Sequence, residues 1–127
     1  MTQNSLKRKK ICIVDDDASI REIFMLKLSS EGYDVVTASD GNEGWSVIKS
    51  QRPDVALIDI MMPGTDGLGL IEMMEKDEEL SKIPVVVLTN LDDEETLQKI
   101  QKLHTKFHLV KSLFEPQKVV GIVKELV

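Results

Sequence analysis

The chain has 127 residues, of which 42% are hydrophobic and 4% aromatic, which suits one domain with an aliphatic core. Its 22 acidic and 16 basic residues give a net charge of -6, and so acidic a chain argues against direct nucleic-acid binding because it repels phosphates. No apolar run approaches the roughly 18 residues that span a bilayer, and the polar N-terminus lacks the apolar stretch of a signal peptide. We therefore expect a cytoplasmic protein with no membrane partner.

Four consecutive basic residues, Lys7 to Lys10, precede the first apolar run. They predict a solvated basic leader over residues 1–8, followed by a single domain over residues 9–127; an anion-binding patch is the alternative. The one cysteine, Cys12, excludes an intramolecular disulfide, and its place within the apolar run predicts a small buried side chain.

The first strand and helix are expected between residues 10 and 32. Residues 10–14 are apolar and β-branched, which predicts a buried strand. The next segment has apolar residues three and four positions apart, as on one face of a helix. These are Ile20, Ile23, Phe24 and Leu28. Gly32 suits the left-handed backbone that often ends a helix.

The second strand is expected over residues 33–38. Asp40 then caps the following helix, with Glu43 at the spacing of a capping box. Trp45 and Ile48 mark the buried face of that helix.

The rest of the chain continues the alternation. Strands are expected at residues 55–58, 84–88 and 107–110, and helices at 67–76, after Asp92 and from Pro116. The apolar positions of these helices recur at helical spacing: Leu70, Ile71, Met74, Leu97, Ile100, Leu103, Val119, Ile122, Val123 and Leu126. Five strands alternating with five helices predict an α/β fold, in which right-handed crossovers make the strands parallel and helices cover both faces of the sheet.

Polar residues follow four of the strands where each one ends. Asp15 and Asp16 follow the first strand, Asp59 the third, Thr89 the fourth and Lys111 the fifth. Ligands of open parallel sheets bind beyond the carboxyl ends of the strands. Neighbouring carboxylates there repel and raise each other's pKa, and Mg2+, which prefers oxygen ligands, removes that repulsion. Magnesium, a lysine, a hydroxyl and a spare carboxylate are the parts needed to attack and stabilise a phosphoryl group.

Four stretches carry a resemblance to a known family: ICIVDDD, DVALIDIMMPGTDG, VVVLTN and HLVKS. One such stretch is a weak signal, but all four in order, each at a strand end, are a strong one. From about Lys9 to Val127 the chain resembles the receiver domain of response regulators in two-component signal transduction. The resemblance implies a doubly wound, CheY-like and flavodoxin-like (βα)5 three-layer sandwich, with a parallel five-stranded sheet in the order 2-1-3-4-5.

The resemblance also implies roles for the acidic residues. Asp59 matches the phosphoacceptor. Asp16 would bind Mg2+ directly and Asp15 through water, while Met61 would offer its backbone carbonyl to the ion. Asp17 is better interpreted as a helix cap.

Two further residues match the family and three positions depart from it. Thr89 matches the hydroxyl that turns toward the phosphoryl group, and Lys111 the lysine that contacts a phosphoryl oxygen. His108 replaces the aromatic switch residue; its imidazole could rotate or titrate near neutral pH, or be a partly buried histidine with one hydrogen bond. Ser112 replaces the proline that follows a cis peptide, a geometry that costs about 2.5–4 kcal/mol before other residues. Asn90 replaces a small residue, which predicts slower exchange with bulky small-molecule donors.

The function implied is that of a switch rather than an enzyme with an outside substrate. A sensor histidine kinase or phosphotransfer protein would phosphorylate Asp59, and the domain would catalyse only its own phosphorylation and dephosphorylation. We expect it to change its binding to a downstream protein or separate output module, as a monomer or a phosphorylation-dependent dimer.

The alternative is a pseudo-receiver that binds a partner without taking phosphate. A Mg2+-dependent phosphohydrolase would need a cap domain or substrate pocket, of which the sequence gives no sign. A flavodoxin-like cofactor binder would need a glycine-rich phosphate loop, and none follows the first strand.

Overall fold

A computed structural model of the chain describes residues 8–60, 67–88, 98, 107–110 and 116–127, with the backbone alone at 107–110. Five strands are present: β1 Lys10–Val14, β2 Asp34–Ala38, β3 Val55–Asp59, β4 Val85–Leu88 and β5 Phe107–Val110. The helices described are α1 Ala18–Ser30, α2 Gly41–Gln51, α3 Gly67–Glu75 and α5 Pro116–Leu126, with a short 3-10 helix, η2 Leu80–Lys82. The helix predicted after Asp92 lies outside the described residues.

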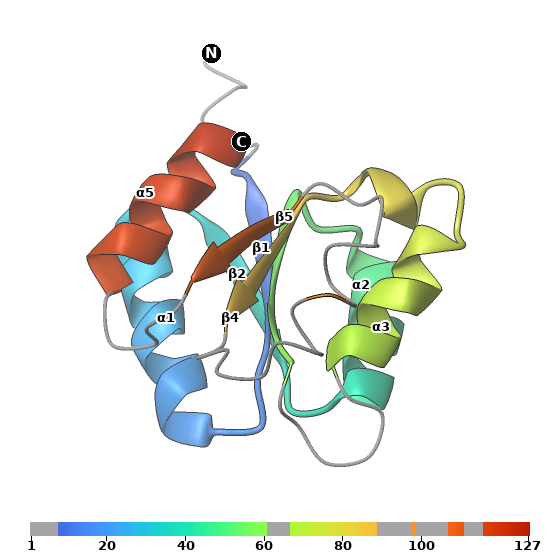
Figure 1. Cartoon of the computed structure of the whole chain (residues 1–127). Coiled ribbons are helices and arrows are strands. Elements are labelled where there is room, and N and C mark those ends of the chain that lie inside the picture. The colour runs from blue at the N-terminus through green and yellow to red at the C-terminus, as the bar shows by residue number, and fades with distance from the viewer. Residues whose placement is uncertain (1–7, 61–66, 89–97, 99–106, 111–115) are drawn as a thin grey trace.

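The five strands form one parallel sheet in the order β2-β1-β3-β4-β5. Figure 1 shows three layers, with α1 and α5 against one face of the sheet and α2 and α3 against the other. The predicted doubly wound α/β sandwich and its strand order are thereby confirmed. The carboxyl ends of the strands consequently gather at one edge of the sheet, which we call the carboxyl edge, opposite the amino edge.

The two faces of the sheet build two aliphatic cores. Along β1, Ile11 and Ile13 belong to the cluster that contains Phe24 of α1, whereas Cys12 and Val14 belong to the cluster on the other face. The alternation follows from the two-residue period of a strand. Cys12 is 0% exposed, and burial raises the pKa of its thiol to about 12.

The predicted helix ends have the expected chemistry. The Asp17 carboxylate accepts hydrogen bonds from the backbone N–H groups two and three residues on. Asp40 accepts one from the N–H of Glu43 at 2.7 Å, and the Glu43 carboxylate accepts one from the N–H of Ser39, where a capping box would use that of Asp40. Gly32 has φ 96, the left-handed conformation expected after α1.

The prediction for one face of α1 was wrong at Ile23, whose side chain is 47% exposed. Phe24 and Leu28 are fully buried. Consecutive helical residues are rotated by about 100°, so Ile23 lies well away from the line that these two share. Leu26, at 61%, is also exposed, so α1 presents apolar side chains to solvent.

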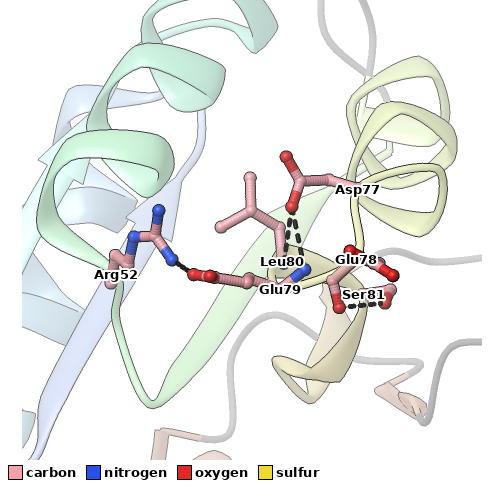
Figure 2. A network of polar contacts seen from close by, with 6 residues as sticks. All are labelled: Arg52, Asp77, Glu78, Glu79, Leu80 and Ser81. Carbon is pink, nitrogen blue, oxygen red and sulfur yellow. Dashed lines mark hydrogen bonds and ion pairs between the residues drawn. The ribbon is translucent and has the colours of Figure 1, made fainter.

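At the amino edge, the end of α2 is tied to η2 (Figure 2). Arg52 ends α2 in the left-handed conformation, with φ 48, and its guanidinium pairs with Glu79. The Asp77 carboxylate in turn accepts hydrogen bonds from the N–H groups of Glu79 and Leu80, at 2.9 and 3.0 Å. Sequence periodicity did not predict this 3-10 turn, because its register is set by the Asp77 side chain.

The start of β1 is anchored to the same edge. The N–H of Lys10 donates to the Asp54 carboxylate at 2.8 Å, and its ammonium donates to the side chain of Gln51 at 2.8 Å. These bonds join three segments that are distant in sequence: the first strand, the end of α2 and the turn before β3.

Candidate functional site

The carboxyl edge brings together the acidic residues that follow β1 and end β3. Val14 pairs in register with Ile58, so the next residues, Asp15 and Asp59, leave adjacent strands side by side. One carboxylate oxygen each from Asp15, Asp16 and Asp59 lies within 4.8 Å of the others. The predicted acidic cluster is therefore present, and its oxygens are close enough to share one cation.

Asp15 is the buried member of the cluster, with 0% exposure. Its Oδ1 accepts a hydrogen bond from the N–H of Asp17 at 2.9 Å, whereas its buried Oδ2 meets no donor within the described part of the chain. Burial raises the pKa of Asp15 above its ordinary value of 3.8, and the nearby charges of Asp16 and Asp17 add to this, whereas the hydrogen bond from the Asp17 N–H and, to a smaller extent, the charge of Arg21 lower it. A buried carboxylate oxygen without a donor costs free energy, and a bound cation would remove that cost.

The other two carboxylates differ in their access to water. Asp16 is exposed, while Asp59 keeps only 7% of its surface. A cation held between them would have the strand ends on one side and solvent on the other. This arrangement suits Mg2+, which keeps several waters and uses one or two carboxylates.

A glycine fixes the backbone on the far side of Asp59. A Cβ atom at Gly67 would overlap the backbone carbonyl of Asp59 and come within 2.9 Å of the Ile58 side chain. The N–H of Gly67 also donates to the carbonyl of Ile60 at 3.4 Å. The first turn of α3 therefore lies directly against the residue proposed to take the phosphoryl group.

The remaining predicted site residues follow strands that reach the same edge. Thr89, Lys111 and Met61, like the departures at Asn90 and Ser112, lie outside the described residues. β4 ends immediately before Thr89 and β5 immediately before Lys111, with Leu88 paired to both Asp59 and Val110. The backbone of His108 lies in β5, in register with Val86 of β4.

One residue near the site was not found from the sequence. Arg21, on the second turn of α1, donates from its guanidinium to the backbone carbonyl of Asp15 at 2.7 Å. A side-chain bond to a backbone carbonyl leaves no mark in hydrophobic periodicity. The available signal was an arginine six residues after the buried aspartate, at the helix end nearest the acidic cluster.

Comparison with known proteins gives the family. The family model described as the response regulator receiver domain matches residues 11–124. This chain belongs to that family. The receiver domain is similar to two solved structures: chemotaxis protein CheY4 of Vibrio cholerae, with TM-score 0.86 and 25% identity over 95% of this chain and 100% of that one, and a response regulator receiver protein of Pseudomonas putida, with TM-score 0.82 and 26% identity over 94% and 98%.

Curated relatives of this receiver domain are longer proteins. The probable transcriptional regulator ycf27 of Guillardia theta is 48% identical over 86 residues, which are 68% of this chain and 33% of the relative. That of Cyanophora paradoxa is 42% identical over 88 residues, 69% and 36% of the two chains. The matched segment thus spans about a third of the length of these relatives. Within its described residues, no helix is long and apolar enough to cross a membrane.

Proposed function

We propose that Asp59 accepts a phosphoryl group from a phosphohistidine of a sensor histidine kinase or phosphotransfer protein, in a reaction supported by Mg2+. The observation that carries this proposal is the acidic cluster, in which oxygens of Asp15, Asp16 and Asp59 lie within 4.8 Å of one another. The buried Oδ2 of Asp15, without a hydrogen-bond donor among the described residues, supports a cation at this place.

The ion would be held by oxygen atoms of this chain. Asp16 and Asp59 would bind Mg2+ directly, Asp15 through a water molecule, and Met61 through its backbone carbonyl. When bound, Mg2+ supplies positive charge that offsets the negative charge on the transferring phosphoryl oxygens.

Asp59 is the nucleophile of the transfer. One of its carboxylate oxygens attacks the phosphorus in line, on the side opposite the phosphohistidine nitrogen. The new O–P bond forms as the P–N bond breaks, and the leaving electron pair stays on the imidazole nitrogen, which takes a proton. Lys111 pairs with a phosphoryl oxygen and Thr89 donates a hydrogen bond to another. Water later attacks the phosphorus of the acyl phosphate, which releases inorganic phosphate and restores the carboxylate.

The partner that donates the phosphoryl group would dock near α1. This helix starts two residues after Asp16, and it exposes Ile23 and Leu26 at 47% and 61%. Exposed apolar residues beside a charged site suit a protein donor, because their burial favours association while the carboxylates meet the reacting group. The domain would then catalyse only its own phosphorylation and dephosphorylation, in the cytoplasm where such kinases act.

Phosphorylation would change binding at a surface that includes β5 and α5. The added charge draws Thr89 toward the site, which frees space for His108 to follow, so the equilibrium shifts between two conformations. The curated relatives are described as probable transcriptional regulators. We therefore propose that the output is transcriptional, through a separate module or protein, with the domain as a monomer or a phosphorylation-dependent dimer that does not itself bind nucleic acid.

Phosphoryl uptake can be tested by intact mass after incubation with acetyl phosphate and Mg2+. The wild type and a control, Asp34→Asn at an exposed position of β2, should each gain one phosphoryl group, and Asp59→Asn none. Equal uptake by Asp59→Asn would overturn the assignment of the acceptor.

A wild type that gains no mass but binds Mg2+ would be retested with a phosphorylated histidine phosphotransfer protein, because Asn90 is expected to slow small donors. A wild type that shows no phosphoryl uptake and no Mg2+ binding would favour the pseudo-receiver. That alternative is motivated by Ser112, His108 and Asn90, the three departures from the family pattern.

A further inference from the structure

Arg21 links α1 to the backbone of the acidic cluster. Its guanidinium donates to the carbonyl of Asp15 at 2.7 Å, and within the described ranges no carboxylate forms an ion pair with it. Asp15 in turn uses Oδ1 to accept from the N–H of Asp17. The turn that carries Asp15 and Asp16 is therefore held from both sides, by a helical side chain and by its own Asx bond.

Arg21 is half-buried, and its surroundings are partly apolar. Beside it lies a shallow hollow of about 210 Å3 that Ala18, Glu22, Met25 and Thr37 also line. The arginine is thus not a freely solvated side chain whose contact is incidental, because the helix and the edge strand restrict it on one side. Apolar neighbours would also accept a methionine at this position without a buried unpaired group.

Two roles for Arg21 predict opposite effects on cation binding. If its charge alone mattered, its removal would strengthen Mg2+ binding, because a positive group near the carboxylates repels the ion. If its hydrogen bond holds Asp15 and Asp16 in place, its removal would weaken Mg2+ binding, because the carboxylates must be brought together again before the ion binds.

We propose that Arg21 is a positioning residue of the acidic cluster, which holds the Asp15–Asp17 turn so that its carboxylates meet Asp59 around one cation. The proposal rests on the proposed function for its Mg2+ part, and on the hydrogen bonds at Asp15 for the rest. The 2.7 Å hydrogen bond from Arg21 and the hydrogen bond from the Asp17 N–H hold the same turn. They favour a role for the hydrogen bond of Arg21 over a role for its charge alone.

The test is isothermal titration of the purified protein with Mg2+. Arg21→Met should weaken Mg2+ binding by about tenfold, the usual scale for loss of an outer support of a metal ligand. Arg21→Lys keeps one donor and the charge, and should remain within about threefold of the wild type. The control is Arg52→Met, which removes one positive charge at the amino edge and should leave the Mg2+ affinity unchanged. Unchanged or tighter binding by Arg21→Met would overturn the proposal.

Backbone amide exchange of the metal-free protein gives a readout that needs no cation. The N–H of Asp17, which donates to Asp15 Oδ1, should exchange about fivefold faster in Arg21→Met, whereas that of Gly44, inside α2, should not change. If the wild type bound no Mg2+, the proposed function would fail, and this exchange rate alone would decide the positioning role. Equal exchange of the Asp17 amide in both proteins would then reject it.

Discussion

At the amino edge of the sheet charged groups meet partners of opposite charge or dipole, whereas at the carboxyl edge like charges crowd together. Lys10 binds Asp54 and Gln51, and Arg52 pairs with Glu79. Across the sheet, three carboxylates lie within 4.8 Å of one another. Both edges belong to the same strands, so topology alone does not set this difference. Contacts at the amino edge stabilise the fold, whereas the like charges at the carboxyl edge destabilise it, at the place where we propose that a cation and a phosphoryl group bind.

The largest expected effect at the carboxyl edge comes from Gly67→Ala. The new methyl would overlap the backbone carbonyl of Asp59, so either α3 or the end of β3 must move. We expect a loss of about 3 kcal/mol in the free energy of unfolding, the upper range for overpacking, together with loss of phosphoryl uptake. Urea unfolding followed by Trp45 fluorescence and intact mass measure the two effects.

Gly121→Ala is the matched control for that substitution. An added Cβ at this exposed position of α5 meets nothing within 4 Å. Alanine is favoured over glycine inside a helix, so stability should rise by about 0.5–1 kcal/mol with phosphoryl uptake unchanged. Similar losses in both variants would show that Gly67 has no special contact with Asp59.

Asp15→Asn should raise the stability of the metal-free protein by about 1 kcal/mol, because it removes a buried charge and keeps an oxygen for the Asp17 N–H. It should also weaken Mg2+ binding. The folded-state pKa of Asp15 is raised above its ordinary 3.8, so the charged carboxyl destabilises the fold at neutral pH and this cost disappears as the pH falls through the raised pKa. The advantage of the variant should therefore shrink in acid. Urea unfolding in EDTA measures it, and a variant less stable than the wild type would contradict this account.

At the amino edge, Arg52 offers a comparison of two substitutions. Arg52→Ala loses the exposed ion pair with Glu79 and keeps a side chain at φ 48, whereas Arg52→Gly loses the pair but suits that φ. The glycine variant should be more stable than the alanine variant by about 1 kcal/mol. Neither should change Mg2+ affinity, and a change in affinity would mean that the two edges are coupled.

The smallest effect is expected for the ion pair between Lys124 of α5 and Glu31, at 2.7 Å. The hydrogen bond from Lys124 holds the pKa of Glu31 below its ordinary 4.5, and Glu31 raises that of Lys124 above 10.5. The pair therefore stabilises the folded state at pH values between the ordinary pKa values of the two groups. Its contribution to the free energy of unfolding is lost as the pH falls through the lowered pKa of Glu31. Lys124→Met should lower the urea midpoint slightly at neutral pH and not in acid; an equal shift at both would point to packing instead.

Much of the fold was predictable because its signals are local. Asp40 and Glu43 predicted the start of α2 through a hydrogen bond that spans three residues, and Gly32 predicted the end of α1 through its left-handed backbone. The exposure of Ile23 was not predictable, because an apolar residue beside a buried stripe has the same spacing whether or not a neighbour covers it. The 3-10 helix η2 was not predictable either, because it depends on a hydrogen bond that the Asp77 side chain accepts from the N–H of Leu80.

The acidic cluster was predictable because parallel strands align their carboxyl ends. The positions of Asp15 and Asp59 at the ends of β1 and β3 sufficed once the family resemblance implied that these strands are adjacent, without any knowledge of side-chain geometry. The support from Arg21 was not predictable, since a bond to a backbone carbonyl depends on the angle at which α1 leaves the turn. The roles of Thr89, Lys111 and His108 stay predictions.

The burial of Cys12 has a practical consequence. Its thiol is 0% exposed at the centre of β1, and its pKa of about 12 leaves almost no thiolate at neutral pH. Alkylating reagents should reach it only when the central strands separate, so its rate of modification would count global opening events directly. For the same reason, a second cysteine introduced on the surface would carry a dye at a single site without removal of the native one.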